Sequence, residues 1–406
     1  MLSPQPSIIK RRRAGFTLIE LMVALVVSAL AALAIYGAFN GLSSAISQTR
    51  SQDNAWQQAR TAMTMLTQAI EGAGYGLPMN LCTAGIYTNT AGSSPPAQPS
   101  YTITPPGGTQ GLFVVPVDAA LQTSASPFSY APASGSSYAL TTVTGGGPFG
   151  SAPVAHISSV HSTNAATFFV DNANLLAQYD MFLVPMPNEH CIMGQITNDP
   201  KSAANNVIAN SGRGTGGSIY NAPQGFNGAD PGVTTTQLLH AGVINLGNGG
   251  FSIKNFFIQD NNGAGVPSLY MQEYPAGTYS NSTSPQPRAI LVARGVVDMQ
   301  IEFGYGLNRT VTTYVPPTMG PPGGMTAGDL LTVKLALLVR STRYNGGQYV
   351  AAGAAKPSIP IMGASYTIPT NLPVGQTQDC VSGNCNQYIY RVFETVIPVR
   401  NDIWAE

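Results

Sequence analysis

The sequence predicts an α+β fold, in which one long N-terminal helix precedes a mostly antiparallel β-sheet. An apolar run from Phe16 to Phe39 continues into a helix-compatible segment that ends near Ile70. Segments with alternating side chains, typical of strands, dominate the last third of the chain. Only 9% of the 406 residues are charged, and there are 44 Gly and 31 Pro. This composition is typical of a β-rich protein with long loops outside the cytoplasm.

A basic cluster in front of the apolar run predicts its orientation in a membrane. Lys10, Arg11, Arg12 and Arg13 form this cluster, and such residues stay on the cytoplasmic side. The run is longer than the apolar core of a secretory signal peptide, about 7–15 residues, and it reaches the roughly 20 residues of a membrane span. A plain membrane anchor fits this length. It leaves Glu20 unexplained, because a charged residue inside a bilayer costs several kcal/mol.

Beyond Phe39 the chain keeps a helical period but becomes polar on one side. Residues three and four apart trace one helix face: Ile46, Thr49, Asp53, Trp56, Arg60, Met63, Leu66 and Ile70. The glycine-rich segment 71–78 is a stop signal. A continuous helix from Phe16 to Ile70 would be about 80 Å long.

The part after the helix is expected to be irregular first and regular later. Short strand candidates lie among turn-rich patches at 111–117, 156–160, 167–170 and 181–184. The segments 251–259 and 268–274 flank Asp260-Asn261-Asn262-Gly263 and predict a β-hairpin. Further strands are expected within 289–304, 332–340 and 388–399, the second of these with one buried face.

The cysteine count favours disulfides. The chain has four cysteines, Cys82, Cys191, Cys380 and Cys385, and an even count in an exported chain is typical of disulfide pairing. Cys380 and Cys385 enclose a short turn, and their pairing would leave Cys82 with Cys191. Four cysteines allow three pairings, and the sequence does not choose among them. Zinc is the alternative, but the spacing is not C-x-x-C and only His190 adjoins a cysteine.

No pattern of residues indicates catalysis. The match of Gly145, Gly147 and Gly150 to a dinucleotide-binding loop contains Pro148 and opens no periodic helix. The four histidines have no G-x-S-x-G or H-E-x-x-H partner motif. Without the basic cluster, 14 basic and 18 acidic residues remain, which gives no basic surface for nucleic acid. We therefore expect no enzyme, no cofactor, no metal and no direct binding of nucleic acid.

The N-terminal pattern resembles the prepilin leader of type IV pilins and pseudopilins, in which a basic run and Gly15 precede Phe16-Thr17-Leu18-Ile19-Glu20. The resemblance implies that a prepilin peptidase cuts between Gly15 and Phe16, and that Phe16 is then N-methylated. It also implies that the Glu20 carboxylate pairs with the Phe16 amine of a neighbouring subunit. The chain would then comprise a leader (1–15), the transmembrane and assembly half of the helix (16–39) and its amphipathic half (40–76).

The C-terminal third resembles the PilW family of minor pilins. The segments that carry this resemblance are 296–306, the strand 331–340 and the terminal stretch from Phe393 to Asn401. The resemblance implies a pilin-like head at 251–406, preceded by a loop-rich variable β region at 77–250. It further implies insertion in the inner membrane, a periplasmic head, and assembly with minor and major pilins into a surface filament.

The resemblance to PilW implies a structural subunit that primes or caps a type IV pilus. Twitching motility, adhesion and DNA uptake would then follow from the filament. Three alternatives remain open from the sequence. One is a large pseudopilin of a type II secretion system, whose leader would look the same. Another is a pilus-tip adhesin built from residues 80–250, and the third is an enzyme tethered by an uncleaved anchor.

Overall fold

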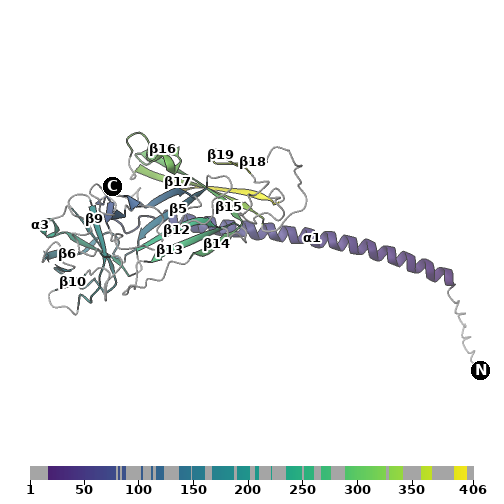
Figure 1. The fold of residues 1–406 in the computed structure, drawn as a ribbon, viewed down its shortest axis with the longest axis horizontal. Helices are drawn as coiled ribbons and strands as arrows, with labels where there is room; N and C mark the ends of the chain where they lie inside the picture. The colour runs from purple at the N-terminus through teal and green to yellow at the C-terminus, as the bar shows by residue number, and fades with distance from the viewer. Residues whose placement is uncertain are drawn as a thin grey trace, which may run out of the picture. The chain divides into compact units, whose positions relative to one another are not determined.

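The computed structural model describes residues 17–78, 81–82, 85–87, 102–103, 111–112, 116–122, 137–147, 149–160, 167–186, 190–201, 206–209, 221, 235–248, 251–259, 267–275, 289–325, 329–341, 358–367 and 388–399. The chain divides into two compact units between Asp53 and Asn54. A single long helix and sheets of mostly antiparallel strands confirm the predicted α+β class (Figure 1).

Helix α1 runs from Leu18 to Glu71 and has 54 residues. Its end confirms the prediction that the glycine-rich segment stops the helix. Gly74 and Gly76 have φ angles of 78° and 75°, a left-handed conformation that glycine adopts without steric cost. The amide of Gly74 donates to the carbonyl of Val143 at 2.7 Å, so the chain passes from the helix directly onto a strand.

The buried face of α1 differs in part from the predicted one. Between Asn54 and Glu71 the fully buried side chains are those of Ala55, Ala59, Ala62, Leu66 and Ile70. Of the predicted face, Leu66 and Ile70 are buried, Trp56 and Met63 are half-buried, and Arg60 is exposed. The prediction favoured large side chains, whereas alanines allow the helix backbone to lie close to the strands.

Two antiparallel sheets share one core with this part of α1. The four-stranded sheet consists of β15 (Val296–Leu307), β16 (Thr310–Val315), β17 (Leu330–Arg340) and β20 (Tyr390–Pro398), in the order β16-β15-β17-β20. The five-stranded sheet consists of β4 (Val117–Leu121), β5 (Tyr138–Gly145), β12 (Phe251–Gln259), β13 (Ser268–Pro275) and β14 (Ile290–Arg294), in the order β14-β13-β12-β5-β4. The common core includes Leu66, Leu140, Phe256, Met299 and Leu335.

The second half of strand β17 is buried on both faces, so the prediction of one buried face was wrong for that half, whereas Thr332 and Lys334 are half-buried. Val333, Leu335 and the next alternate residues join the core with α1. On the other face, Ala336 and Leu338 pack against Ile361 and Tyr366. These two residues belong to a hairpin of β18 (Ser358–Ile361) and β19 (Ala364–Thr367). We did not predict this hairpin, which covers a face that would otherwise be solvated.

The hairpin predicted from residues 251–259 and 268–274 is confirmed. Strands β12 and β13 pair antiparallel from Ser252↔Pro275 to Gln259↔Ser268 without interruption. The predicted turn at 260–263 lies outside the described residues. Strand β5, which the threonine- and glycine-rich sequence did not suggest, pairs with β12 on its other side. The predicted strands at 289–304 and 388–399 correspond to β14, β15 and β20.

A third, nine-stranded sheet is formed between α1 and β12 in the sequence, in the order β10-β7-β6-β11-β8-β9-β1-β3-β2. Its strands are β1 (Gly85–Tyr87), β2 (Thr102–Ile103), β3 (Gly111–Leu112), β6 (Pro153–Val160), β7 (Thr167–Val170), β8 (Met181–Pro185), β9 (His190–Gln195), β10 (Val207–Ala209) and β11 (Gly242–Gly247). Short helices lie at α3 (Thr235–Leu238) and η2 (Pro317–Met319). The predicted strands at 156–160, 167–170 and 181–184 lie within β6, β7 and β8. Of the predicted strand at 111–117, the structure describes the part in β3 and the part at the start of β4.

Strand β8 connects two cores, because its side chains are buried on both faces. Phe182 and Val184 pack in a cluster with Phe168 and Ile157 of the same sheet. Met181 and Leu183 pack in another cluster that includes Val143 and Phe251 of the five-stranded sheet. The nine-stranded sheet is therefore joined to the five-stranded sheet by an apolar interface.

A buried carboxyl in β15 predicts a pH dependence of stability. Asp298 is 1% exposed, and this burial raises the pKa of its carboxyl above the ordinary value of 3.8. The Gln300 amide donates to both carboxylate oxygens at 3.1 Å and offsets part of the effect on the pKa. The folded state thus binds the proton more tightly than the unfolded state. The favourable contribution of Asp298 to the free energy of unfolding is complete below the unfolded-state pKa and is lost as pH rises through the folded-state pKa.

The wild type should therefore lose stability as pH rises from acidic to neutral, and Asp298→Asn should abolish this loss. Urea unfolding of the full chain from about pH 4 to about pH 8 measures this, and the variant should be at least as stable as the wild type at neutral pH. Asp171→Asn is the control, since the His156 amide donates to Asp171 and lowers the pKa of that exposed carboxyl. A wild-type pH profile unchanged by Asp298→Asn would contradict the role of this group.

Candidate assembly interface

The first turn of α1 is capped by two side chains that hydrogen-bond each other. The backbone amide and the hydroxyl of Thr17 both donate to Glu20 Oε2 at 3.0 Å. In return, the amide of Glu20 donates to Thr17 Oγ1 at 3.3 Å. This arrangement is a capping box, which satisfies amides that have no partner within the helix. The T-x-x-E spacing in the sequence is the signal for the capping box, and we did not predict the box from it.

The capping box engages one carboxylate oxygen of Glu20. Within the part of the chain that the structure describes, the other oxygen, Oε1, accepts no hydrogen bond. An ionised carboxylate can accept at both oxygens. Glu20 can therefore keep its contacts with Thr17 while Oε1 accepts a hydrogen bond from a cation of another molecule.

The apolar side chains around Glu20 are uncovered. All the large apolar side chains from Leu18 to Leu42 are 57–78% exposed: Leu18, Ile19, Leu21, Met22, Val23, Leu25, Val26, Val27, Leu30, Leu33, Ile35, Tyr36, Phe39 and Leu42. By length and composition α1 could cross a membrane. A surface that is apolar on all sides is stable only in lipid or against other apolar helices.

Thr17→Val should loosen the first turn of α1 without changing its apolar character. The valine keeps the size and the backbone amide but loses the hydroxyl that donates to Glu20 and accepts from its amide. Loss of such a cap costs about 1 kcal/mol, so amides 18–21 should exchange hydrogen about fivefold faster in detergent-solubilised protein. Thr17→Ser keeps the hydroxyl and is the control. Equal exchange in the valine and serine variants would show that the hydroxyl does not support the turn.

Several predicted site residues lie outside the described residues. They are the basic residues Lys10, Arg11, Arg12 and Arg13, the cleavage residues Gly15 and Phe16, and the cysteines Cys380 and Cys385. Cleavage, N-methylation and the Cys380–Cys385 pair therefore stay predictions. Glu20 is described, and its pairing with another subunit also stays a prediction.

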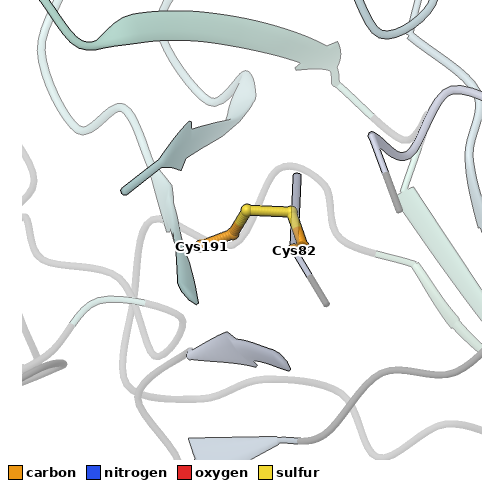
Figure 2. The surroundings of a disulfide bond; sticks show 2 residues. All are labelled: Cys82 and Cys191. Carbon is orange, nitrogen blue, oxygen red and sulfur yellow. A yellow bond between two sulfur atoms is a disulfide. The ribbon is translucent and has the colours of Figure 1, made fainter. Parts of the chain in front are cut away.

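The structure contains a disulfide between Cys82 and Cys191, one of the three pairings that the sequence left open (Figure 2). Cys82 lies shortly after the end of α1, and Cys191 lies in β9. Their Cα atoms are 5.3 Å apart, and the bond closes a sequence separation of 109 residues. Both cysteines are at most 1% exposed and pack with Leu77 and Val143. The bond therefore ties the nine-stranded sheet to the end of the helix.

No metal-binding arrangement is found in the described ranges, where no three His, Cys, Asp or Glu side chains gather. His156 Nδ1 lies 3.4 Å from Asp171 Oδ2, with both side chains more than half exposed, and this is a pair without a third ligand among the described residues. This pair belongs to the junction of β6 with the segment after β7. The predicted lack of a metal and a cofactor stays an expectation.

Comparison with known proteins finds two matches. Residues 10–36 match the family model of the prokaryotic N-terminal methylation motif. Residues 255–401 match the family model of PilW, the type IV pilus-assembly protein W. The two matches support a type IV pilus-related, pilin-like protein whose C-terminal part is similar to PilW. Domains of this kind are structural rather than enzymatic.

The PilW region begins within β12 and extends beyond β20, so it includes the whole four-stranded sheet. The nine-stranded sheet lies outside it. The methylation motif includes the capping box of Thr17 and Glu20 and part of the exposed apolar surface. A search of curated proteins finds no match, and a search of solved structures finds none.

Proposed function

We propose that this protein is a low-copy minor pilin, a structural subunit that primes or caps the assembly of a type IV pilus. The observation that supports this most directly is the lone carboxylate of Glu20, held in a capping box at the start of an uncovered apolar helix. Such a helix has the length and composition of a membrane span, and its carboxylate keeps one oxygen for an outside partner. The PilW match of the C-terminal sheet supports a role related to the type IV pilus.

In this proposal, processing creates the partner that Glu20 needs. A prepilin peptidase cuts between Gly15 and Phe16, and the new amine of Phe16 is N-methylated and stays cationic. This amine is one residue before Thr17, at the same end of the helix as Glu20. On a neighbouring subunit it pairs with Glu20 Oε1. A charge pair is much stronger in low dielectric than in water, and an unpaired carboxylate there is penalised.

Assembly then exchanges lipid for neighbouring helices around α1. The apolar surface from Leu18 to Leu42 is buried both in the membrane and in the filament. The charge pair therefore supplies the free-energy difference that favours the filament. In the membrane the chain crosses once, with Lys10 and the arginines on the cytoplasmic side and the head in the periplasm. Its partners are the prepilin peptidase, other minor and major pilins, and lipid of the inner membrane. A head of this size would crowd a closely packed shaft, which favours a position at the tip or base.

A deletion strain tests this function. Its pili are counted by electron microscopy, and its protein secretion is assayed in parallel, with the wild-type gene restored as the control. We expect few or no pili and normal secretion. Normal piliation with defective secretion would instead identify a large pseudopilin of a type II secretion system.

A pilus-tip adhesin is a second candidate, favoured by the nine-stranded sheet. This sheet has its own apolar core and lies outside the PilW match, so it is an additional ordered body on the head. Segments 91–100 and 212–219, which lie outside the described residues, can be shortened without removing a described strand. If the variants make normal numbers of pili but attach less well to surfaces, the adhesin is favoured.

A further inference from the structure

The packing of α1 on the sheets weakens toward the first turns that belong to the head unit. This unit begins at Asn54. Farther along the helix, the large side chains of Leu66 and Ile70 are fully buried. Nearer Asn54 the fully buried side chains are the alanines Ala55 and Ala59. Because buried apolar area sets the hydrophobic contribution, these alanines hold the helix much less strongly than Leu66 and Ile70 do.

Two polar contacts occur in this weakly packed part of the helix. The guanidinium carbon of Arg391 lies 5.0 Å from the ring centroid of Trp56 and 5.4 Å from that of Phe393. Such a position over aromatic rings is attractive for a cation. Arg391 lies on β20, an edge strand of the four-stranded sheet, and Trp56 is half-buried.

The second contact comes from the other sheet. The backbone amide of Arg294 donates to Gln58 Oε1 at 2.8 Å. Arg294 is the last residue of β14, an edge strand of the five-stranded sheet. Gln58 is two residues beyond Trp56, so one turn of α1 is held from edge strands of both sheets.

We propose that Trp56, Gln58, Arg294 and Arg391 form a clamp that holds residues 54–60 of α1 on the head. They are positioning residues, since they determine where the part of the helix that is bound to the head begins. The large apolar side chains secure the helix from Leu66 onward, and the clamp replaces the apolar area that the alanines lack. In a filament, force between helix and head would pass through this turn. That last consequence rests on the proposed function, whereas the clamp itself does not.

Hydrogen exchange of the full chain in detergent, read by mass spectrometry, tests the clamp. Arg391→Met keeps the length of the side chain without its charge, and Gln58→Met removes the acceptor for the Arg294 amide. Each should speed exchange at residues 54–60 about threefold to fivefold and leave residues 66–70 unchanged. Arg391→Lys keeps a cation and should restore much of the protection.

Arg60→Met is the matched control, because Arg60 is an exposed cation on the same helix. The clamp is overturned if Arg391→Met and Gln58→Met exchange no faster than Arg60→Met at residues 54–60. It is also overturned if these variants lose protection in β17 to the same extent, since the effect would then be a general loss of the head. Normal piliation of a strain that lacks this protein would count against the proposed function and not against the clamp, because the exchange measurement does not depend on pili.

Discussion

Glu20→Ala is expected to be inserted in the membrane and cut like the wild type, yet to be nearly absent from pili. The basic cluster and the apolar run that direct insertion and cleavage are intact in this variant. The variant loses the carboxylate that pairs with the Phe16 amine of a neighbour. Breaking a buried ion pair costs about 3–5 kcal/mol, so incorporation should fall by about 100-fold to several thousand-fold. Immunoblots of sheared pili and of membranes, compared between the two strains, measure the effect.

Glu20→Gln separates the charge of Glu20 from its role in the capping box. Glutamine is accepted at the third helical position of a capping box, so it should keep the contacts with Thr17 while removing the negative charge. We expect it to fail in incorporation almost as severely as Glu20→Ala. Thr17→Val should show the reverse, with a loosened first turn and much milder loss of incorporation. Normal incorporation of Glu20→Gln would show that the charge pair does not drive assembly.

Replacement of both Cys82 and Cys191 by alanine is expected to lower the free energy of unfolding by about 3–5 kcal/mol. The bond closes a separation of 109 residues, and the loop-entropy relation gives about 4.8 kcal/mol for a loop of that length. Alanine adds no buried polar atom at these sites. Urea unfolding of the full chain under non-reducing conditions measures the loss, and the nine-stranded sheet should lose protection from hydrogen exchange first.

The second predicted pair provides the control for the disulfide. Cys380 and Cys385 enclose a short loop, for which the same relation gives about 2 kcal/mol. Replacing both by alanine should therefore destabilise the protein less than replacing Cys82 and Cys191. A larger effect of the Cys380 and Cys385 replacements would show that the long-range bond is not the main covalent support of the head.

The helix was the most predictable element because its signals are local. The apolar run, the helical period and the glycines after Glu71 depend only on neighbouring residues. The buried face was harder, since close approach to the sheets favours Ala55 and Ala59 over the larger Trp56. That preference depends on strands more than 200 residues away, such as β15 and β17, and no local pattern carries it.

The sheets show the same limit. The hairpin of β12 and β13 was predicted because both strands flank one turn signal. The nine-stranded sheet was harder because its pairings are distant, as in the parallel pairing of Gly85 in β1 with His190 in β9. The choice of Cys82 with Cys191 depends on that pairing. The capping box of Thr17 and Glu20 was within reach, since its spacing is visible in the sequence.

The N-terminal tryptic peptide of the protein from sheared pili tests the central claim most directly. After removal of the leader, the first basic residue is Arg50, so trypsin releases one peptide from Phe16 to Arg50. The proposal predicts this peptide in the pilus fraction, with one methyl group on the Phe16 amine. Protein that retains residues 1–15, or that is confined to the membrane fraction while pili are abundant, would contradict assembly through Glu20.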